Sequence, residues 1–245
     1  MEKVTIRECV LYKGDCLDMI AELAPGSVDL CTSDPPYGIN YYAGSRRVMS
    51  IPDVLANDEK PRVEYVPPIV RVVKSGGAIY LCTRIDVMPA WAAALENAGA
   101  KLKTPIFWDK CATTKGDLLG DYSNQIEIVL FAHVGRHLLR NGRPNNLWSI
   151  PRLAASEHPT VKPVELIKRC IINSSDVGDL VLDPFLGSGT TAVACILTGR
   201  RFIGAEINPK YFDMSCERIK RAYRDVDNRL PGFRPMEDEQ KLLFN

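Results

Sequence analysis

Residues 181–191 read Val-Leu-Asp-Pro-Phe-Leu-Gly-Ser-Gly-Thr-Thr, and this stretch decides the predicted fold. Its apolar start is typical of a buried strand, and the residues after Gly189 have the pattern of a helix. Gly187 and Gly189 suit the turn between them, because glycine adopts positive φ and lets a ligand approach the backbone closely. We therefore predict a strand, a glycine-rich turn and a helix that bind a ligand at the carboxyl end of the strand.

The residues around this turn narrow the class of ligand. Glu206 ends the next predicted strand, where its carboxylate can accept hydrogen bonds from the two hydroxyls of a ribose. A P-loop needs lysine after its last glycine, and Thr190 stands there instead. A dinucleotide-binding fingerprint needs a third glycine, which this turn lacks. A tight turn with no ligand remains an alternative at this point.

The rest of the chain alternates short apolar runs with helical patterns, as in an α/β sheet covered by helices. Strands are predicted at residues 4–12, 28–32, 78–82, 104–108, 126–132, 180–183 and 202–206. Helices are predicted at residues 16–23, 63–73, 87–98, 163–173, 190–197 and 209–223. No helical pattern separates 104–108 from 126–132, so these strands should pair antiparallel at one edge. The predicted fold is a single doubly wound, mostly parallel α/β sheet of seven strands with one antiparallel edge strand.

Composition excludes several other classes of protein. With 245 residues, 46% hydrophobic and 25% charged, the chain is neither disordered nor a disulfide-stabilised miniprotein. A net charge of +1 argues against a histone-like coat for nucleic acid. The eight cysteines form no Cys-x-x-Cys pair, so we predict no zinc ribbon, no metal site and reduced thiols. The absence of a signal-like start and of any apolar run of ~20 residues predicts a soluble, cytoplasmic protein that does not contact a membrane.

A second motif, Ser33-Asp34-Pro35-Pro36-Tyr37-Gly38, follows the predicted strand 28–32. The two prolines fix φ and remove backbone donors, so the turn is rigid. It presents a carboxylate, a backbone carbonyl and an aromatic ring at the end of a strand. Such a set can hold a planar ring that bears an amino group, with Asp34 accepting from the amino protons and Tyr37 stacking on the ring. A proline turn without any ligand is the alternative.

Together, the two motifs resemble the paired signatures of S-adenosylmethionine-dependent DNA amino-methyltransferases. The catalytic motif comes before the cofactor motif, an order similar to that of the β group of this family. His158-Pro159-Thr160-x-Lys162-Pro163 is similar to the segment that begins the family's cofactor region. Gly14-Asp15-Cys16-Leu17 is similar to its adenine contact. The resemblance covers residues from about 10 to about 220 and implies the Rossmann-like methyltransferase sheet, with strand 180–183 beside strand 28–32.

The resemblance also implies roles for individual residues. The flipped base would be held by Asp34, Pro35, Pro36 and Tyr37. The cofactor S-adenosyl-L-methionine would be bound by Asp15, Cys16, His158, Thr160, Lys162, Asp183, Phe185, Gly187, Ser188, Gly189, Thr190 and Glu206. Within this set, Glu206 would take the ribose, residues 15–16 the adenine edge and the glycine turn the methionine part. A methyltransferase domain would span residues 1–224, with a catalytic half at 1–132, a recognition insert at 133–157 and a cofactor-binding half at 158–224. No role is predicted for the tail at 225–245.

Duplex DNA is the predicted partner. Between Ile128 and Ser156 the chain has four arginines, two histidines and no carboxylate, where the family reads DNA. Arginine and asparagine read base edges well, and basic loops position the backbone. The residues predicted to bind DNA are Arg46, Arg47, Arg136, Arg140, Arg143, Asn145 and Asn146. The family also admits a homodimer and a cognate restriction endonuclease as partners.

The leading interpretation is transfer of a methyl group to the N6 amino group of adenine. Asp34 in place of serine leans towards adenine within the family. Cytosine-N4 methylation uses the same mechanism and is the first alternative. Methylation of RNA or protein, and nucleotide binding without catalysis, are the remaining alternatives.

Overall fold

The computed structural model describes residues 1–37, 61–113, 120, 122–152 and 161–229. The strands are β1 (Glu2–Ile6), β2 (Cys9–Lys13), β3 (Val28–Ser33), β4 (Val73–Thr83), β5 (Lys101–Leu102), β6 (Ile106–Asp109), β7 (Ile126–His133), β8 (Leu147–Ser149), β9 (Leu180–Asp183) and β10 (Arg201–Glu206). The helices are α1 (Cys16–Glu22), α2 (Val66–Val72), α3 (Met88–Asn97), α4 (Val164–Ser174), α5 (Thr190–Thr198) and α6 (Pro209–Arg229), with a 3-10 helix η1 (Val63–Tyr65).

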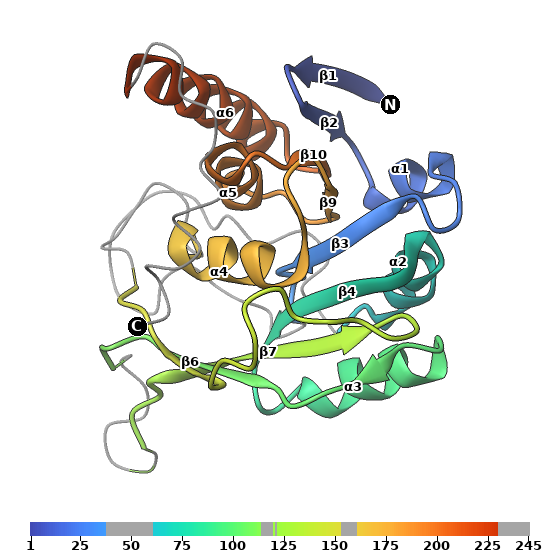
Figure 1. The fold of residues 1–245 in the computed structure, drawn as a ribbon, viewed down its shortest axis with the longest axis vertical. Coiled ribbons are helices and arrows are strands. Elements are labelled where there is room, and N and C mark those ends of the chain that lie inside the picture. The colour runs from blue at the N-terminus through green and yellow to red at the C-terminus, as the bar shows by residue number, and fades with distance from the viewer. Residues whose placement is uncertain (38–60, 114–119, 121, 153–160, 230–245) are drawn as a thin grey trace.

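These strands form one mixed sheet in the order β1-β2-β10-β9-β3-β4-β7-β6-β8, with β5 paired to β7 (Figure 1). Strands β2, β10, β9, β3 and β4 run parallel, whereas β7 runs antiparallel to both β4 and β6. The predicted α/β class and the mostly parallel sheet are confirmed. The implied neighbourhood of β9 and β3 is confirmed as well, since Leu30 pairs with Val181 and Cys31 with Leu182.

Three details of the predicted sheet are wrong. Residues 4–12 form two antiparallel strands, because Arg7 takes a φ of 51° and reverses the chain between β1 and β2. The antiparallel strand β7 lies inside the edge, since β6 and β8 continue the sheet beyond it. The described chain has ten strands in the sheet where seven were predicted. The short strands β5 and β8 were missed because two or three residues carry no readable period.

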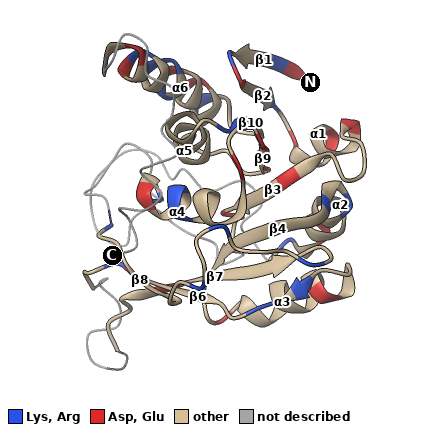
Figure 2. Ribbon diagram, viewed as in Figure 1, with Lys and Arg blue, Asp and Glu red and all other residues tan. Residues whose placement is uncertain are grey.

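Most helices lie where the periodicity predicts them. The predicted helix at 63–73 divides into η1 and α2, and Val73 already begins β4. Helix α6 continues to Arg229, so it crosses the predicted domain boundary at residue 224. Acidic and basic residues alternate along it (Figure 2). Within the described ranges, no helix is both long enough and apolar enough to cross a membrane.

The core lies on both faces of the sheet. Helices α4, α5 and α6 pack over a cluster that includes Leu30 and Val181, whereas α1, α2 and α3 pack over one that includes Cys31 and Leu182. All four of these strand residues are fully buried. Successive side chains of a strand point to opposite faces, so strands buried on both faces read as continuous apolar runs. This explains why the central strands were predicted well.

Parallel pairing brings the two sequence motifs together. Strand β3 ends at Ser33, directly before Asp34, and its neighbour β9 ends at Asp183. Strand β10 pairs with β9 on the other side and ends at Glu206. Because the carboxyl ends of parallel strands lie at one edge of a sheet, all three carboxylates lie at the same edge. This is the edge where open α/β sheets bind their ligands.

Candidate active site

Residues 34–37 follow β3 and form the turn of the predicted catalytic motif, called the catalytic turn below. Two of its side chains bond to each other. The Tyr37 hydroxyl donates a hydrogen bond to Asp34 Oδ1 at 2.7 Å. Burial raises the pKa of Tyr37 well above its usual value, and the nearby Asp34 carboxylate adds to this effect. The hydroxyl therefore stays protonated and remains a donor. Asp34 and Tyr37 are thus brought together as predicted, with the orientation of the carboxylate fixed from one side.

Lys162 lies against this turn, in a place that the sequence did not predict. Its Nζ donates to Asp34 Oδ2 at 2.8 Å and to the Tyr37 hydroxyl at 3.1 Å. The same ammonium lies 5.5 Å from the centroid of the Tyr37 ring, within range of a cation–π contact. The resemblance places Lys162 beside the cofactor, but in the structure its charged group contacts the catalytic carboxylate.

Two further charged residues, which no sequence motif predicted, continue the ion pair between Lys162 and Asp34. Glu127 Oε2 lies 3.4 Å from Lys162 Nζ, and Glu127 Oε1 lies 3.4 Å from Lys110 Nζ. Burial alone would raise the pKa of Glu127, but the two lysines lower it, so the carboxylate is ionised. Glu127 lies on β7 and Lys110 directly after β6. No local motif marks them, because strand pairing alone brings them to this edge.

The glycine turn after β9 has the backbone that its sequence predicts. Gly187 has a φ of 51° and Gly189 a φ of 83°, both in the left-handed region. A Cβ at Gly189 would also lie 3.2 Å from the Cβ of Ser215 on α6. Gly189 is therefore required both for the turn and for the close approach of α6. Gly189 directly precedes the first residue of α5, Thr190.

Asp183 supports the turn from inside the protein. Its carboxylate accepts hydrogen bonds from the Thr191 hydroxyl at 2.6 Å and from the Phe185 amide at 3.0 Å. Burial raises the pKa of Asp183 to about 7, and the charges of Asp34 and Glu206 contribute to the rise. Its side chain is therefore occupied with holding the strand, the turn and α5 together. The prediction that it binds the cofactor directly is not tested by these contacts.

Glu206, the last residue of β10, connects this strand to the glycine turn that follows β9. Its Oε2 accepts from the Gly187 amide at 2.8 Å and its Oε1 from the Asn208 amide at 2.7 Å. Burial raises the pKa of Glu206 above its usual value, while these backbone donors oppose the rise. Each carboxylate oxygen can accept more than one hydrogen bond, so capacity remains for ribose hydroxyls.

The residues predicted near the adenine ring lie beside an aromatic pair. Asp15 caps α1 by accepting from the Leu17 amide at 2.9 Å, and Cys16 is buried in the first turn of that helix. The Tyr65 ring meets the Phe185 ring edge-on, with centroids 5.0 Å apart. Tyr65 had no predicted role, because it lies in η1 outside every motif.

The charge of the site fits the predicted cofactor. Asp34, Asp183 and Glu206 are close enough for the charges of the first and last to raise the pKa of the second. Such a field favours a ligand that carries a positive charge, as the sulfonium of S-adenosylmethionine does. The left-handed glycines leave backbone exposed to a ligand, and Glu206 supplies the ribose acceptor. The residues present therefore fit this cofactor. His158 and Thr160 lie outside the described residues.

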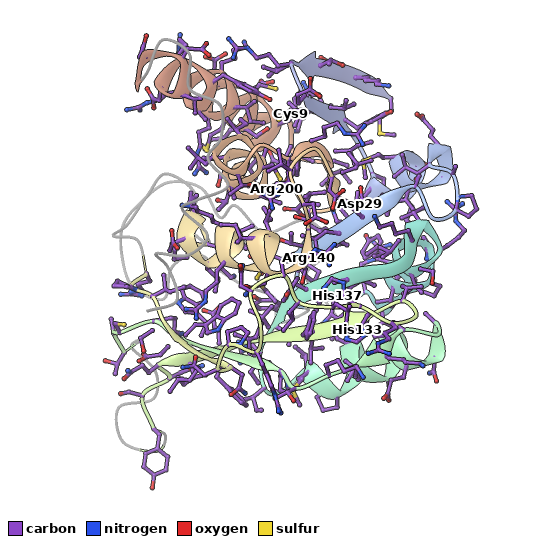
Figure 3. The ribbon with its side chains drawn as sticks, in the orientation of Figure 1. Cys9, Asp29, His133, His137, Arg140 and Arg200 are labelled. Carbon is purple, nitrogen blue, oxygen red and sulfur yellow. The ribbon has the colours of Figure 1, made fainter. Side chains whose placement is uncertain are left out.

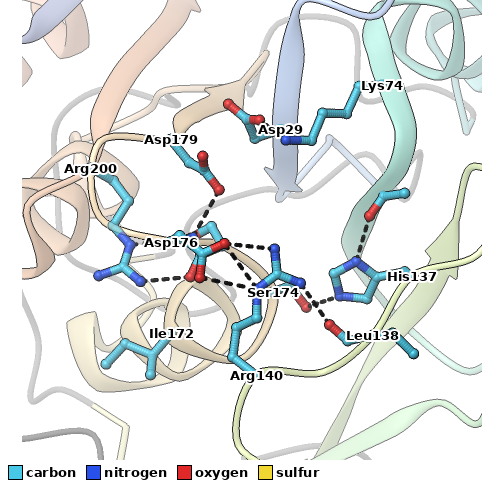
Figure 4. A network of polar contacts seen from close by, with 12 residues as sticks. Asp29, Lys74, His137, Leu138, Arg140, Ile172, Ser174, Asp176, Asp179 and Arg200 are labelled. Carbon is cyan, nitrogen blue, oxygen red and sulfur yellow. Dashed lines mark hydrogen bonds and ion pairs between the residues drawn. The ribbon is translucent and has the colours of Figure 1, made fainter. Parts of the chain in front are cut away.

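Two of the arginines predicted to read DNA, Arg136 and Arg140, lie away from this edge. Arg140 forms an ion pair with Asp176 at 3.0 Å (Figure 4). Asp176 precedes β9, and its amide donates to Asp179 in the same connection, so this pair lies at the opposite edge, where the parallel strands begin. Arg136 follows β7, and its carbonyl lies near Gly76, close to the start of β4. The structure therefore does not bring Arg136 and Arg140 to the catalytic turn, because β7 carries the chain away from that edge.

The remaining residues predicted to bind DNA lie near β8 or outside the described residues. The Asn146 side chain donates to the Pro105 carbonyl at 2.8 Å and so holds β8 against β6. Arg143 and Asn145 are exposed before β8, at the outer side of the sheet. Arg46 and Arg47 lie outside the described residues, so their predicted contact with DNA stays a prediction.

His133 is the last residue of β7, and His137 comes four residues later (Figure 3). His137 Nδ1 lies 2.7 Å from the Gly76 carbonyl oxygen and its Nε2 lies 2.9 Å from the Ser174 hydroxyl. Nδ1 therefore carries a proton, and both ring nitrogens of His137 are occupied by the fold. Burial lowers the pKa of His137, which keeps the ring neutral.

Comparison with known proteins gives consistent matches. Residues 138–217 match the family model described as DNA methylase. The chain is 29% identical over 247 residues to the DNA adenine methyltransferase YhdJ of Escherichia coli K12, covering 85% of this chain and 82% of that protein. It resembles the crystal structure of the M1.HpyAVI complex with S-adenosylmethionine at 25% identity and a TM-score of 0.67, over 85% of this chain and 98% of the other. The PvuII DNA methyltransferase, described as cytosine-N4-specific, shares the fold with a TM-score of 0.71 at 16% identity, over 91% of this chain and 94% of the other.

Proposed function

We propose, from the premise that this chain is an S-adenosylmethionine-dependent DNA amino-methyltransferase of the β group, that it methylates the N6 amino group of adenine at a specific site in duplex DNA. The observation that carries the proposal is the position of Asp34. Its carboxylate is held at the carboxyl end of β3, beside the glycine turn that ends β9. An acceptor for an amino group therefore lies next to the turn that suits the cofactor.

Asp34 has the chemistry that amino methylation requires. The lone pair of the amino nitrogen is delocalised into the ring, which makes the nitrogen a poor nucleophile. Asp34 and the Pro35 carbonyl can each accept one amino proton, and both hydrogen bonds favour a pyramidal nitrogen whose lone pair is free. S-adenosylmethionine, when bound, would supply a methyl group on a cationic sulfur that leaves with the electrons of the C–S bond. The methylated nitrogen would then lose one proton to solvent water, and positioning and electrostatics would supply most of the catalysis.

Tyr37 and the prolines would hold the base itself. A base must leave the duplex before its amino group can reach Asp34, at a cost of a few kcal/mol. Stacking on the Tyr37 ring offsets part of that cost, since base–aromatic stacking contributes about 1–3 kcal/mol. Pro35 and Pro36 keep the turn rigid, so little further ordering is needed when the base arrives.

The choice of adenine rests on two lines of support. Position 34 is aspartate, which leans towards adenine in the family that the motifs resemble. The relative from Escherichia coli is named an adenine methyltransferase. The shared fold of the cytosine-N4 enzyme means that the architecture alone does not separate the two bases. A cytoplasmic location, a homodimer and a cognate restriction endonuclease remain predictions.

The direct test is chemical identification of the product. Duplex DNA is incubated with the protein and isotopically labelled S-adenosylmethionine, digested to nucleosides and analysed by mass spectrometry. We expect labelled N6-methyldeoxyadenosine in wild-type samples and none with Asp34→Ala, while this variant still binds the cofactor in calorimetry. Labelled N4-methyldeoxycytidine would replace the adenine assignment. Full activity in Asp34→Ala would remove Asp34 from its proposed role.

A further inference from the structure

A row of alternating charges runs from the catalytic turn into the protein, and the reaction described above uses only its first member. It consists of Asp34, Lys162, Glu127 and Lys110. The Lys162 ammonium lies 2.8 Å from Asp34 and 3.4 Å from Glu127, which in turn lies 3.4 Å from Lys110. The four residues come from four separate segments of the chain. Such a row forms only when the whole edge of the sheet is assembled.

Burial makes this row unlike a surface ion pair. The side chains of Lys162 and Lys110 are only 10% and 6% exposed. Burial by itself would lower the pKa of Lys162, but Asp34, Tyr37 and Glu127 together raise it well above its usual value. Lys162 therefore stays charged. Buried ion pairs often stabilise a protein no better than apolar side chains do, so stability is a weak explanation for this row.

The contacts of Lys162 fix the carboxylate of Asp34 in one orientation. Lys162 donates to Oδ2 while the Tyr37 hydroxyl donates to Oδ1. Only the remaining lone pairs of the two oxygens can then accept from a substrate.

Glu127 acts on Lys162 by charge more than by a directed bond. Within the described residues, its buried Oε2 has no hydrogen-bond donor, although the Lys162 ammonium is 3.4 Å away. Lys110 donates to the other oxygen at 3.4 Å. Glu127 therefore serves as the counter-charge that keeps Lys162 in place at the catalytic turn.

We propose that Lys162 is a positioning residue for methyl transfer, which holds the Asp34 carboxylate directed at the amino group, with Glu127 as its counter-charge. The inference rests on the proposed function, because it requires that Asp34 accepts from the substrate. It differs from the role in cofactor binding that the sequence motif implies for Lys162.

Four ionisable groups face Lys162 and affect its pKa. Asp34 and Tyr37 face it from the catalytic turn, Glu127 from β7 and Cys82 from β4. Burial raises the pKa of Cys82 well above its usual value, as it does for Tyr37, so both are neutral near pH 7. Lys162 lowers the pKa of Glu127, so a loss of Lys162 should raise the pKa of Glu127.

The test compares neutral and charged replacements of Lys162. Single-turnover methylation of duplex DNA is measured against pH for K162M, K162Q and K162R. We expect K162M and K162Q to be about 100-fold slower, as for other lost transition-state contacts. K162R keeps the charge and should retain most of the wild-type rate. K74M is the matched control, because Lys74 on β4 pairs with Asp29 on β3 at the opposite edge of the sheet, and it should match wild type.

The role of Glu127 is tested by a double-mutant cycle. E127Q should slow transfer about tenfold, and the double variant K162M/E127Q should be no slower than K162M alone, since Glu127 acts through Lys162. Additive losses would overturn the part of the proposal that concerns Glu127.

A readout without DNA separates this proposal from the proposed function. The side-chain carboxyl resonance of Glu127 is followed by carbon NMR as pH is lowered, and its midpoint should lie higher in K162M than in wild type, because Lys162 lowers the pKa of Glu127. An unchanged midpoint in folded K162M, or a loss of cofactor affinity alone, would overturn the role of Lys162. If K162M does not fold, K162Q decides by the same measurement. A moved midpoint in a protein that leaves DNA unmethylated would support the coupling and reject the DNA substrate.

Discussion

Arg218 Nη1 donates hydrogen bonds to both the carbonyl oxygen and the hydroxyl of Ser188, at 2.7 and 2.6 Å. Arg218 lies in α6 and Ser188 in the glycine turn, so this contact ties the turn to the helix packed behind it. The neighbouring basic residues Lys220 and Arg221 instead form exposed pairs with Glu217 and Asp225 on the same helix.

Arg218→Met should weaken binding of S-adenosylmethionine. Hydrogen bonds to a charged group contribute about 1.5–3 kcal/mol, and their loss would free the turn that is predicted to bind the cofactor. We expect a dissociation constant at least about tenfold higher in calorimetry. Arg221→Met is the matched control, since Arg221 is exposed on the same helix. If both variants bind the cofactor equally well, the turn does not depend on Arg218.

Asp183 should make the protein less stable as pH rises. Its pKa is about 7 in the folded protein, against about 3.9 in an unfolded chain. Between these values the folded state holds a proton that the unfolded state has lost, so the free energy of unfolding falls as pH increases from about 4 to about 7. The fall amounts to at most ~4 kcal/mol for this group. Asp183→Asn removes the titration, and other carboxylates titrate alike in both proteins.

Urea unfolding at pH 5 and pH 8 measures this effect. We expect wild type to lose more unfolding free energy between these pH values than Asp183→Asn does. Parallel pH dependence of the two proteins would show that Asp183 titrates at its usual value.

Glu206→Gln should bind the cofactor weakly at every pH. The ionised carboxylate accepts from the Gly187 and Asn208 amides and, as proposed, would also accept from the ribose, whereas an amide has only one acceptor oxygen. Burial raises the pKa of Glu206, so the carboxylate becomes protonated sooner than usual as the solution is acidified. Wild-type affinity for S-adenosylmethionine should therefore fall from pH 7 to pH 5, while that of the variant stays flat. Calorimetry at both pH values checks this, with Glu217→Gln as an exposed control. An equal fall in Glu206→Gln would exclude Glu206 as its source.

The architecture could be predicted from the sequence because its central strands are buried on both faces. Leu30, Val181 and their neighbours form apolar runs that contain no competing helical pattern. The hairpin between β1 and β2 was missed, since it depends on a left-handed Arg7, a conformation that non-glycine residues rarely adopt. Edge strands of two or three residues were missed because pairing rather than pattern defines them.

Site residues could be predicted where they belong to one local sequence motif, and not where distant segments bring them together. Asp34 and Tyr37 lie within one turn, and Glu206 ends a strand beside another predicted one. Lys162 and Glu127 meet across segments far apart in the chain, at a point that depends on the register of β7 and the path of the chain before α4. Spacing in sequence carries no information about such a meeting. The same limit explains the misplaced arginines, since the direction of β7 decides which edge they reach.

The direction of β7 leads to a last prediction, on DNA binding. Arg140 pairs with Asp176 at the opposite edge, so Arg140→Ala should leave DNA affinity within about twofold of wild type. It should cost at most about 1 kcal/mol of stability, as partly exposed pairs do. Arg152 follows β8, and its amide donates to the Lys110 carbonyl at the catalytic edge. Arg152→Ala should therefore weaken DNA binding and reduce the salt dependence of affinity by about one counterion. Binding isotherms of both variants at several salt concentrations compare them directly, and a stronger effect of Arg140→Ala would mean that DNA lies along the other edge of the sheet.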